Sequence, residues 1–186
     1  MFVNTEATYS AFIGTTLLAS GTRAGVLAAL KARFDLDPGT LFLTFHDQTG
    51  KQVDFDLRGT FAEVQARYDP AVARTGPGRP KLGVVAREVS LLPRHWGWLE
   101  EQPAGASAAI RRLVDEARKR DPGEQQVRMA IEAAGRFLTA MAGDLPGYEE
   151  ATRALYARDR NRFQELIAPW PPDIRRHALR LLPEAF

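Results

Sequence analysis

The chain contains no cysteine among its 186 residues, which excludes disulfide bonds, thiol catalysis and cysteine-based zinc sites. No apolar run approaches the roughly 20 residues that a membrane-spanning helix needs. The first residues, MFVNTEATYSAFIG, lack the basic segment and the apolar segment of a secretory signal peptide. We therefore expect a cytoplasmic protein that makes no contact with a membrane.

Sequence motifs of common enzymes are also missing. There is no GxxxxGK[ST] or GxGxxG phosphate loop, and no GxSxG nucleophile elbow. The histidines lie far apart in the sequence: His46, His95 and His177. One group of carboxylates is expected on a single hairpin: Asp47, Asp54 and Asp56. Such a group could bind a cation in a metal-dependent enzyme, although a solvated outer face explains it more simply. We expect neither an enzyme nor a cofactor.

Positive charge is concentrated in the middle of the chain. The whole sequence has 25 basic and 23 acidic residues and a net charge of +2. Residues 76–120 hold nine basic and five acidic side chains, hence +4, and the segments before and after each carry −1. Most of the basic residues are arginines, which bind phosphates and carboxylates in a forked geometry. The pattern favours an anionic partner for this segment, with a solvated basic surface as the alternative.

Residues 1–68 predict a small α+β unit. The expected elements are a strand or hairpin in 8–20, a helix in 22–34, a hairpin in 41–59 and a short helix in 60–68. In the second arm of the later hairpin, Val53, Phe55 and Leu57 share one face. Thr60 and Glu63 have the spacing of a capping box at the start of the last helix.

Residues 69–83 read as a basic linker rich in proline and glycine. The tripeptide Gly78-Arg79-Pro80 resembles the core of an AT-hook, although Pro77 stands where a complete hook has another arginine. In that motif the extended tripeptide lies in a narrow minor groove, whose negative potential attracts arginine. The resemblance implies that Arg79 and Lys81 form an arm that contacts DNA.

Residues 84–120 predict a strand in 84–91, a helix that begins at Pro93, and a second helix capped by Ser107. Four residues of the second helix form an apolar face: Ile110, Leu113, Val114 and Ala117. Trp96 and Trp98 point about 200° apart on the first helix, so both cannot face one core. Core or interface packing is the simpler role for these tryptophans, ahead of base stacking.

This order of strand, short helix, Gly-x-Ser and second helix resembles the ribbon-helix-helix fold. In that family, strands from two chains form a ribbon that enters the major groove. The resemblance implies the following roles: Arg87 and Ser90 as base readers, Gly105 and Ser107 as a phosphate clamp, and Arg111 and Arg112 as further phosphate ligands. The first helix is about one turn shorter than is usual in the family. In one strand register Glu88 would also face the phosphates and repel them.

Residues 121–186 predict a helical C-terminal region, whose first apolar stripe is Val127, Ile131, Ala134, Leu138 and Met141. The basic runs RDRNRF and DIRRHALR read as solvated faces. Three segments resemble an uncharacterised bacterial domain of unknown function over nearly the full length: GRPKLGVVAREVSLLPRHWGWL, GASAAIRRLVDEAR and AMAGDLPGYEEATRALYARDRNRF. That resemblance implies a bacterial cytoplasmic protein and names no activity.

Together these observations predict an α+β protein with a ribbon-helix-helix-like middle segment. The expected function is DNA binding as a homodimer, in a transcriptional regulator or an architectural factor. The alternative is a protein-interaction module that binds no nucleic acid, in which Leu92, Trp96 and Leu99 form the docking surface.

Overall fold

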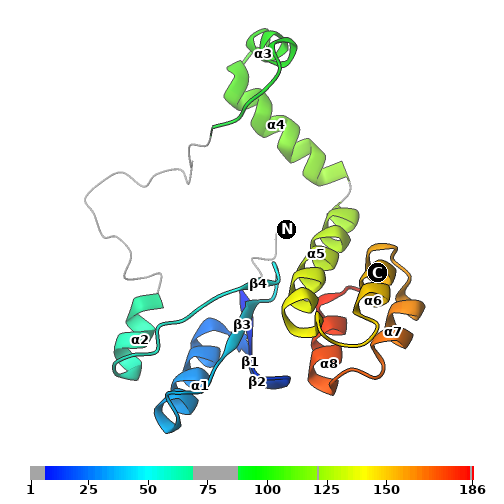
Figure 1. The fold of residues 1–186 in the computed structure, drawn as a ribbon. Coiled ribbons are helices and arrows are strands. Elements are labelled where there is room, and N and C mark those ends of the chain that lie inside the picture. Colours follow the sequence, from blue (N-terminus) through cyan, green and yellow to red (C-terminus); the bar gives the residue numbers. More distant parts are fainter. Residues whose placement is uncertain (1–6, 69–87, 121, 185) are drawn as a thin grey trace. The chain divides into compact units, whose positions relative to one another are not determined.

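The computed structural model describes residues 7–68, 88–120, 122–184 and 186. The chain divides into two compact units, each described by itself. Unit 1 combines residues 1–70 with 126–186, and unit 2 comprises residues 71–125. An antiparallel sheet near the N-terminus and helices in the rest of the described chain make this an α+β fold (Figure 1), which confirms the expected fold class.

The sheet of unit 1 is antiparallel, with strand order β2-β1-β3-β4. Its strands are β1 (Thr8–Ile13), β2 (Thr16–Thr22), β3 (Leu43–His46) and β4 (Lys51–Gln52). The first two strands form a hairpin that turns at Gly14, whose φ of 55° favours glycine. The hairpin alternative for residues 8–20 is therefore the correct one.

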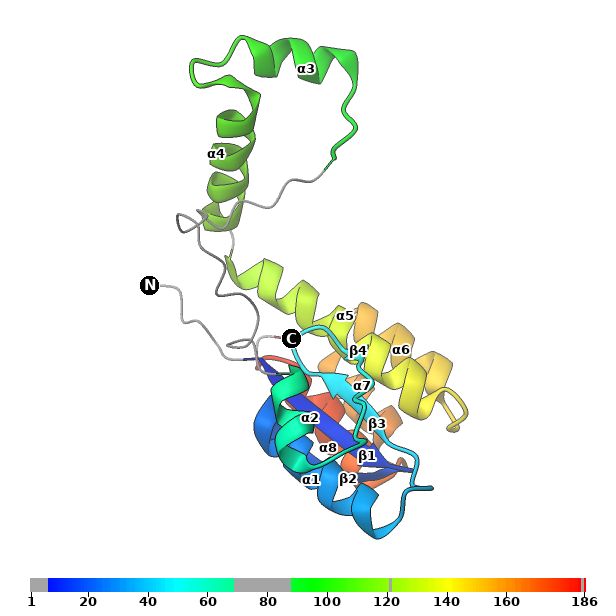
Figure 2. The ribbon, with the colours of Figure 1, turned by 90° about the vertical axis from the view of Figure 1, so that its left-hand side faces the viewer.

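The central strand β1 is buried on both faces because helices cover each side of the sheet (Figures 1 and 2). Tyr9 and Ala11 pack with α1 (Arg23–Leu36) and α2 (Phe61–Tyr68) on one face. Phe12 packs on the other face with the C-terminal helices. This alternation follows from the two-residue period of a strand. Residues 1–68 and 121–186, separate regions in the sequence analysis, thus contribute to one shared core.

Local sequence signals explain the two helices on the first face. The α1 helix begins after Thr22, whose side chain accepts a hydrogen bond from the Gly25 amide, and it ends at Leu36, with Asp37 as the C-cap residue. The capping box at α2 is confirmed. The Thr60 amide donates to the Glu63 carboxylate at 2.7 Å, and the Glu63 amide donates to Thr60 Oγ1 at 3.4 Å.

The prediction of a long second arm in the 41–59 hairpin is wrong. Strand pairing stops at β4, and residues 53–58 form no strand. The apolar face of the arm still packs as the alternation indicates, because Leu57 is buried and Val53 and Phe55 are partly buried in the α1–α2 cluster. After one more backbone bond to β3, from the Val53 amide to the Thr44 carbonyl at 2.8 Å, burial and side-chain bonds from α2 hold this segment in place of a ladder.

Helices form the second layer of unit 1: α5 (Pro122–Ala142), α6 (Tyr148–Tyr156), α7 (Arg160–Ile167) and α8 (Pro172–Leu181). The predicted α5 stripe is confirmed, since its members are buried except for the partly buried Met141. Trp170, after α7, is linked to the segment before α6, because its Nε1 donates to the Pro146 carbonyl at 2.9 Å. None of the described helices combines the length and the apolarity that crossing a bilayer requires.

Unit 2 contains a helical hairpin of α3 (Pro93–Glu100) and α4 (Gly105–Arg120). Pro93 occupies the first turn of α3, as predicted. The prediction that Ser107 caps the second helix is wrong, because α4 already begins at Gly105, whose φ is 74°. Of the predicted strand, residues 84–87 lie outside the described residues. Residues 88–91 form no strand pairing, and the backbone is extended at Leu92, the residue before α3.

Candidate functional site

The α3–α4 hairpin buries little of its apolar surface. Within the described part of unit 2, only Leu99 and Ala109 fall to 4% exposure. Six of the eleven exposed large hydrophobic residues in the described chain belong to this hairpin and the segment before it: Val89, Leu92, Trp96, Trp98, Leu113 and Val114. Because soluble monomers rarely expose large apolar surfaces, these side chains make the hairpin a candidate interface.

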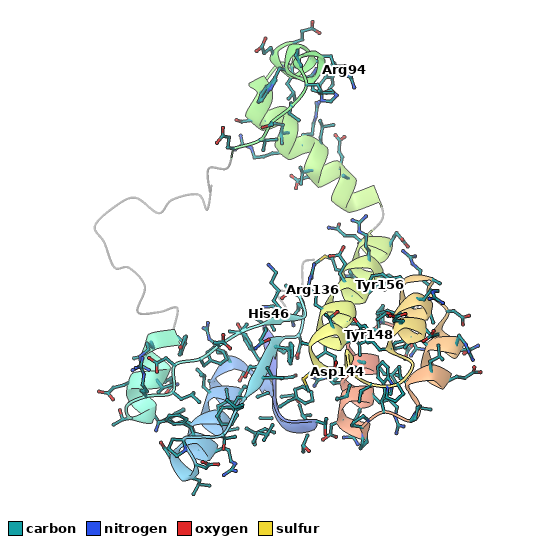
Figure 3. The ribbon with its side chains drawn as sticks, viewed as in Figure 1. His46, Arg94, Arg136, Asp144, Tyr148 and Tyr156 are labelled. Atoms are coloured by element: carbon teal, nitrogen blue, oxygen red, sulfur yellow. The ribbon has the colours of Figure 1, made fainter. Side chains whose placement is uncertain are left out.

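A groove of about 300 Å³ lies between the two helices. Its apolar wall is formed mainly by Trp98, Leu99, Ile110 and Leu113. Arg94 also borders the groove and projects from α3 (Figure 3). Trp96 does not line the groove and remains 37% exposed. The two tryptophans therefore serve different surfaces, as their spacing on the helix requires.

The structure describes five of the eight candidate DNA-binding residues. The other three, Arg79, Lys81 and Arg87, lie outside the described residues. Ser90, Gly105, Ser107, Arg111 and Arg112 are all exposed. Gly105 and Ser107 stand in the first turn of α4, the end of a helix that favours an anion, although the Gly105 amide itself donates to the Gln102 carbonyl at 3.0 Å.

The two arginines of α4 differ in their partners. Arg112 donates to the Gln102 side chain at 3.2 Å and lies 3.8 Å from the Glu116 carboxylate. Arg111 makes no hydrogen bond or ion pair with any described residue. Its guanidinium is therefore available to an anion from outside the chain.

The expected carboxylate group of the 41–59 hairpin is dispersed. Asp56 pairs with Arg58 at 2.8 Å, and this hydrogen bond holds the pKa of the Asp56 carboxyl well below its usual range. Asp54 is exposed, and Asp47 faces a different set of partners on α8. Across the described residues, no three histidine or acidic side chains gather as metal ligands. The structure thus brings together no cation site here.

A polar cluster that the sequence analysis missed connects α8 to the sheet. The Ser10 hydroxyl donates to Asp47 at 2.7 Å. Arg180 Nη2 donates to the Ser10 oxygen at 2.7 Å and to His177 Nδ1 at 2.9 Å, and it lies 3.4 Å from the Asp47 carboxylate. The DIRRHALR helix therefore has a polar side that faces the protein, contrary to the expected solvated face. No local signal could reveal this, because Ser10 and Arg180 are 170 positions apart.

Ser10, Asp47 and His177 are residue types of a hydrolytic triad, but their geometry is not that of one. Ser10 is fully buried and donates to Asp47 instead of to the histidine. Since Arg180 donates to His177 Nδ1, the imidazole proton resides on Nε2, which lies 3.8 Å from the Asp47 carboxylate. Burial, and next the Arg180 charge, lower the pKa of His177 to about 4, against the opposing effect of Asp47.

Comparison with known families supports the near-full-length resemblance noted in the sequence. Residues 8–182 match DUF2239, a family described as an uncharacterized protein conserved in bacteria. The chain belongs to this family. Neither the curated proteins nor the solved structures provide a significant match. The family description names no activity, so the residues themselves must supply the functional argument.

Proposed function

We propose that this protein binds DNA as a homodimer through the segment formed by residues 88–120. The observation that carries the proposal is the exposed apolar face of the α3–α4 hairpin, which follows a segment, residues 88–92, that forms no strand pairing. In a ribbon-helix-helix protein a strand precedes two such helices, and a second chain supplies both the partner of that strand and the facing helices.

The hairpin itself indicates that a second copy of this chain covers its apolar face. The two helices of the hairpin lie between Pro93 and Arg120, and structures of fewer than about 40 residues usually need oligomerisation or cross-links to form a stable core. Leu113 and Val114 are 41% and 50% exposed, although they lie on the predicted apolar face of α4. A two-fold axis would place this face against its own copy, and it would bring residues 88–92 of the two chains side by side.

The charge of the segment supports DNA as the ligand of that dimer. Residues 76–120 carry +4, in contrast to −1 on either side. Arg111 has no partner among the described residues, and the start of α4 is exposed near it. In a dimer each of these groups occurs twice, and phosphate contacts of this kind fix the register of a protein on a duplex.

The apolar groove favours a second candidate, a protein-interaction module without nucleic acid. Its walls suit the apolar face of an amphipathic helix, with Trp98 and Leu99 as contact residues. The two candidates respond differently to salt. Binding to phosphates weakens steeply with salt, whereas an apolar helix–groove contact does not.

The test is fluorescence anisotropy of a labelled random duplex titrated with the full chain over a salt series. We expect binding that weakens steeply with salt, and the double variant Arg111→Ala/Arg112→Ala should bind more weakly. The control is Arg162→Ala, a surface arginine of unit 1 that pairs with Glu165. Equal binding by the double variant and the control would contradict the proposed phosphate contacts. A dimer that binds no duplex at low salt would favour the second candidate.

A further inference from the structure

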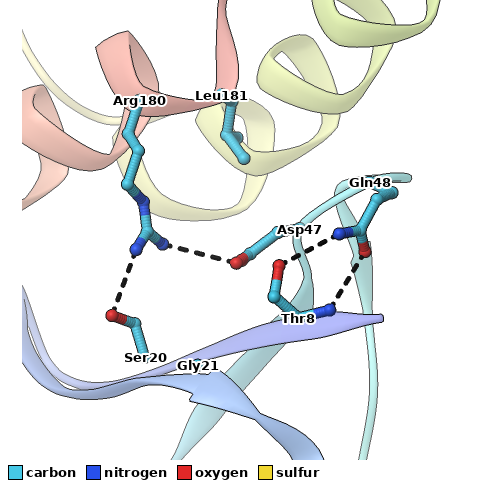
Figure 4. A pocket seen from close by; sticks show the side chains of 7 residues that line it. All are labelled: Thr8, Ser20, Gly21, Asp47, Gln48, Arg180 and Leu181. Carbon is cyan, nitrogen blue, oxygen red and sulfur yellow. Dashed lines mark hydrogen bonds and ion pairs between the residues drawn. The ribbon is translucent and has the colours of Figure 1, made fainter. Parts of the chain in front are cut away.

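We propose that unit 1 contains a binding pocket for a small zwitterion of the α-amino-acid type. The pocket lies between the β1–β2 hairpin, the turn after β3 and the end of α8 (Figure 4). Its volume is about 460 Å³, within the range of roughly 300–1,000 Å³ that is typical of small-molecule sites. The site is separate from the hairpin of unit 2 and does not depend on the proposed DNA binding.

Charge complementarity defines the class of ligand. The Arg180 guanidinium and the Asp47 carboxylate both line the pocket, with 3.4 Å between Nη2 and Oδ2 (Figure 4). A simple anion would be repelled by Asp47, and a simple cation would be repelled by Arg180. A molecule that carries one carboxylate and one ammonium group satisfies both residues.

The Arg180 side chain is held in place and keeps donor capacity. Nη1 donates to Ser20 at 3.1 Å, and Nη2 donates to Ser10 and His177. Nε donates to none of the described residues, and the side chain is 45% exposed. A guanidinium has five N–H donors, so the fixed group can still bind a ligand carboxylate. Because its neighbours already order it, binding costs little side-chain entropy.

The remaining walls fit the other parts of such a ligand. Asp47 Oδ1 accepts from Ser10, whereas Oδ2 has only the longer contact to Arg180 and can accept from an ammonium group. Leu181 supplies an apolar wall for a ligand side chain. At Gly21 nothing lies within 4 Å of the position of a Cβ atom, so this wall of the pocket stays open.

The experiment is a two-dimensional amide NMR titration of the full chain with each of the natural L-amino acids. Acetate and methylammonium are the half-ligand probes. We expect at least one L-amino acid to cause saturable shifts of the Ser20, Gly21 and Gln48 amides that neither half-ligand reproduces. Arg180→Gln should weaken this binding by at least about tenfold, since a charged hydrogen bond is lost. Arg176→Gln, on the exposed side of the same helix, should leave it unchanged.

A milder variant separates ligand binding from folding. Arg180→Gln also loses the bonds to Ser10 and His177, so its fold is checked by its amide spectrum. Ser20→Ala removes only one bond to Arg180 and should bind the same amino acid more weakly while remaining folded. The proposal is overturned if no amino acid shifts these amides, if acetate alone gives the same shifts, or if Ser20→Ala and folded Arg180→Gln both bind as the parent chain does. These shifts are read without DNA, so their outcome is independent of the proposed function.

Discussion

Replacing Leu113 and Val114 with serine should disrupt the proposed dimer. Complete burial of such side chains stabilises by roughly 1.5–3 kcal/mol each. Because 41% of Leu113 and 50% of Val114 remain exposed, covering the remainder contributes roughly 0.6–1.2 and 0.8–1.5 kcal/mol. Each residue occurs twice in a symmetric dimer, so the double variant should lose roughly 3–5 kcal/mol of association free energy.

That loss corresponds to a rise of more than about a hundredfold in the dimer Kd. Sedimentation equilibrium of the full chain and of Leu113→Ser/Val114→Ser measures it directly. Met129→Ser is the matched control, because Met129 is 49% exposed on α5 in unit 1. The reasoning is refuted if the parent chain is monomeric at micromolar concentration, or if the double variant dimerises as tightly as the control does.

The other predictions concern the stability of unit 1. Asp47→Asn should lower the free energy of unfolding by about 1–3 kcal/mol in urea denaturation, whereas the exposed Asp54→Asn should change it little; equal effects would contradict the role of the polar cluster. Since the pKa of His177 is lowered to about 4 in the folded state, the folded state favours the neutral imidazole. This contribution to stability is present above the unfolded pKa of about 6.5 and is lost as pH falls through 4. Urea denaturation of His177→Gln over this pH range should therefore show a smaller acid-induced loss than the parent chain, and an unchanged pH dependence would contradict this. Gly50→Ala should destabilise far more than Gly14→Ala in thermal unfolding. Both have positive φ, but only at Gly50 would a Cβ overlap the α5 backbone; similar losses would refute the close approach.

Sequence reasoning succeeded where the signal is local. The apolar spacing of α1, the capping box of Thr60 and Glu63, and the first-turn position of Pro93 each depend on residues within one or two helical turns. It failed at Ser107, because the positive φ of Gly105 starts α4 earlier than a side-chain cap would. It also failed at residues 53–58, where burial replaces strand pairing.

The polar cluster around Asp47 could not be predicted in the same way. Its members come from β1, the turn after β3, and α8, and no local sequence pattern distinguishes any of them. Helix geometry places His177 beside Arg180 on α8, but only tertiary packing brings Asp47 to them. The apolar face of α4 was visible in the sequence, but only the structure shows that Leu113 and Val114 remain exposed in the single chain.

The most direct test of the proposed DNA binding is the salt dependence of duplex affinity, measured by anisotropy for the full chain and for Arg111→Ala/Arg112→Ala. If both arginines of each copy contact phosphates, the double variant removes up to four contacts from a dimer. The slope of log K against log salt should then become shallower by about 3–4. An unchanged slope, or no binding of the parent chain at low salt, would contradict DNA recognition through α4.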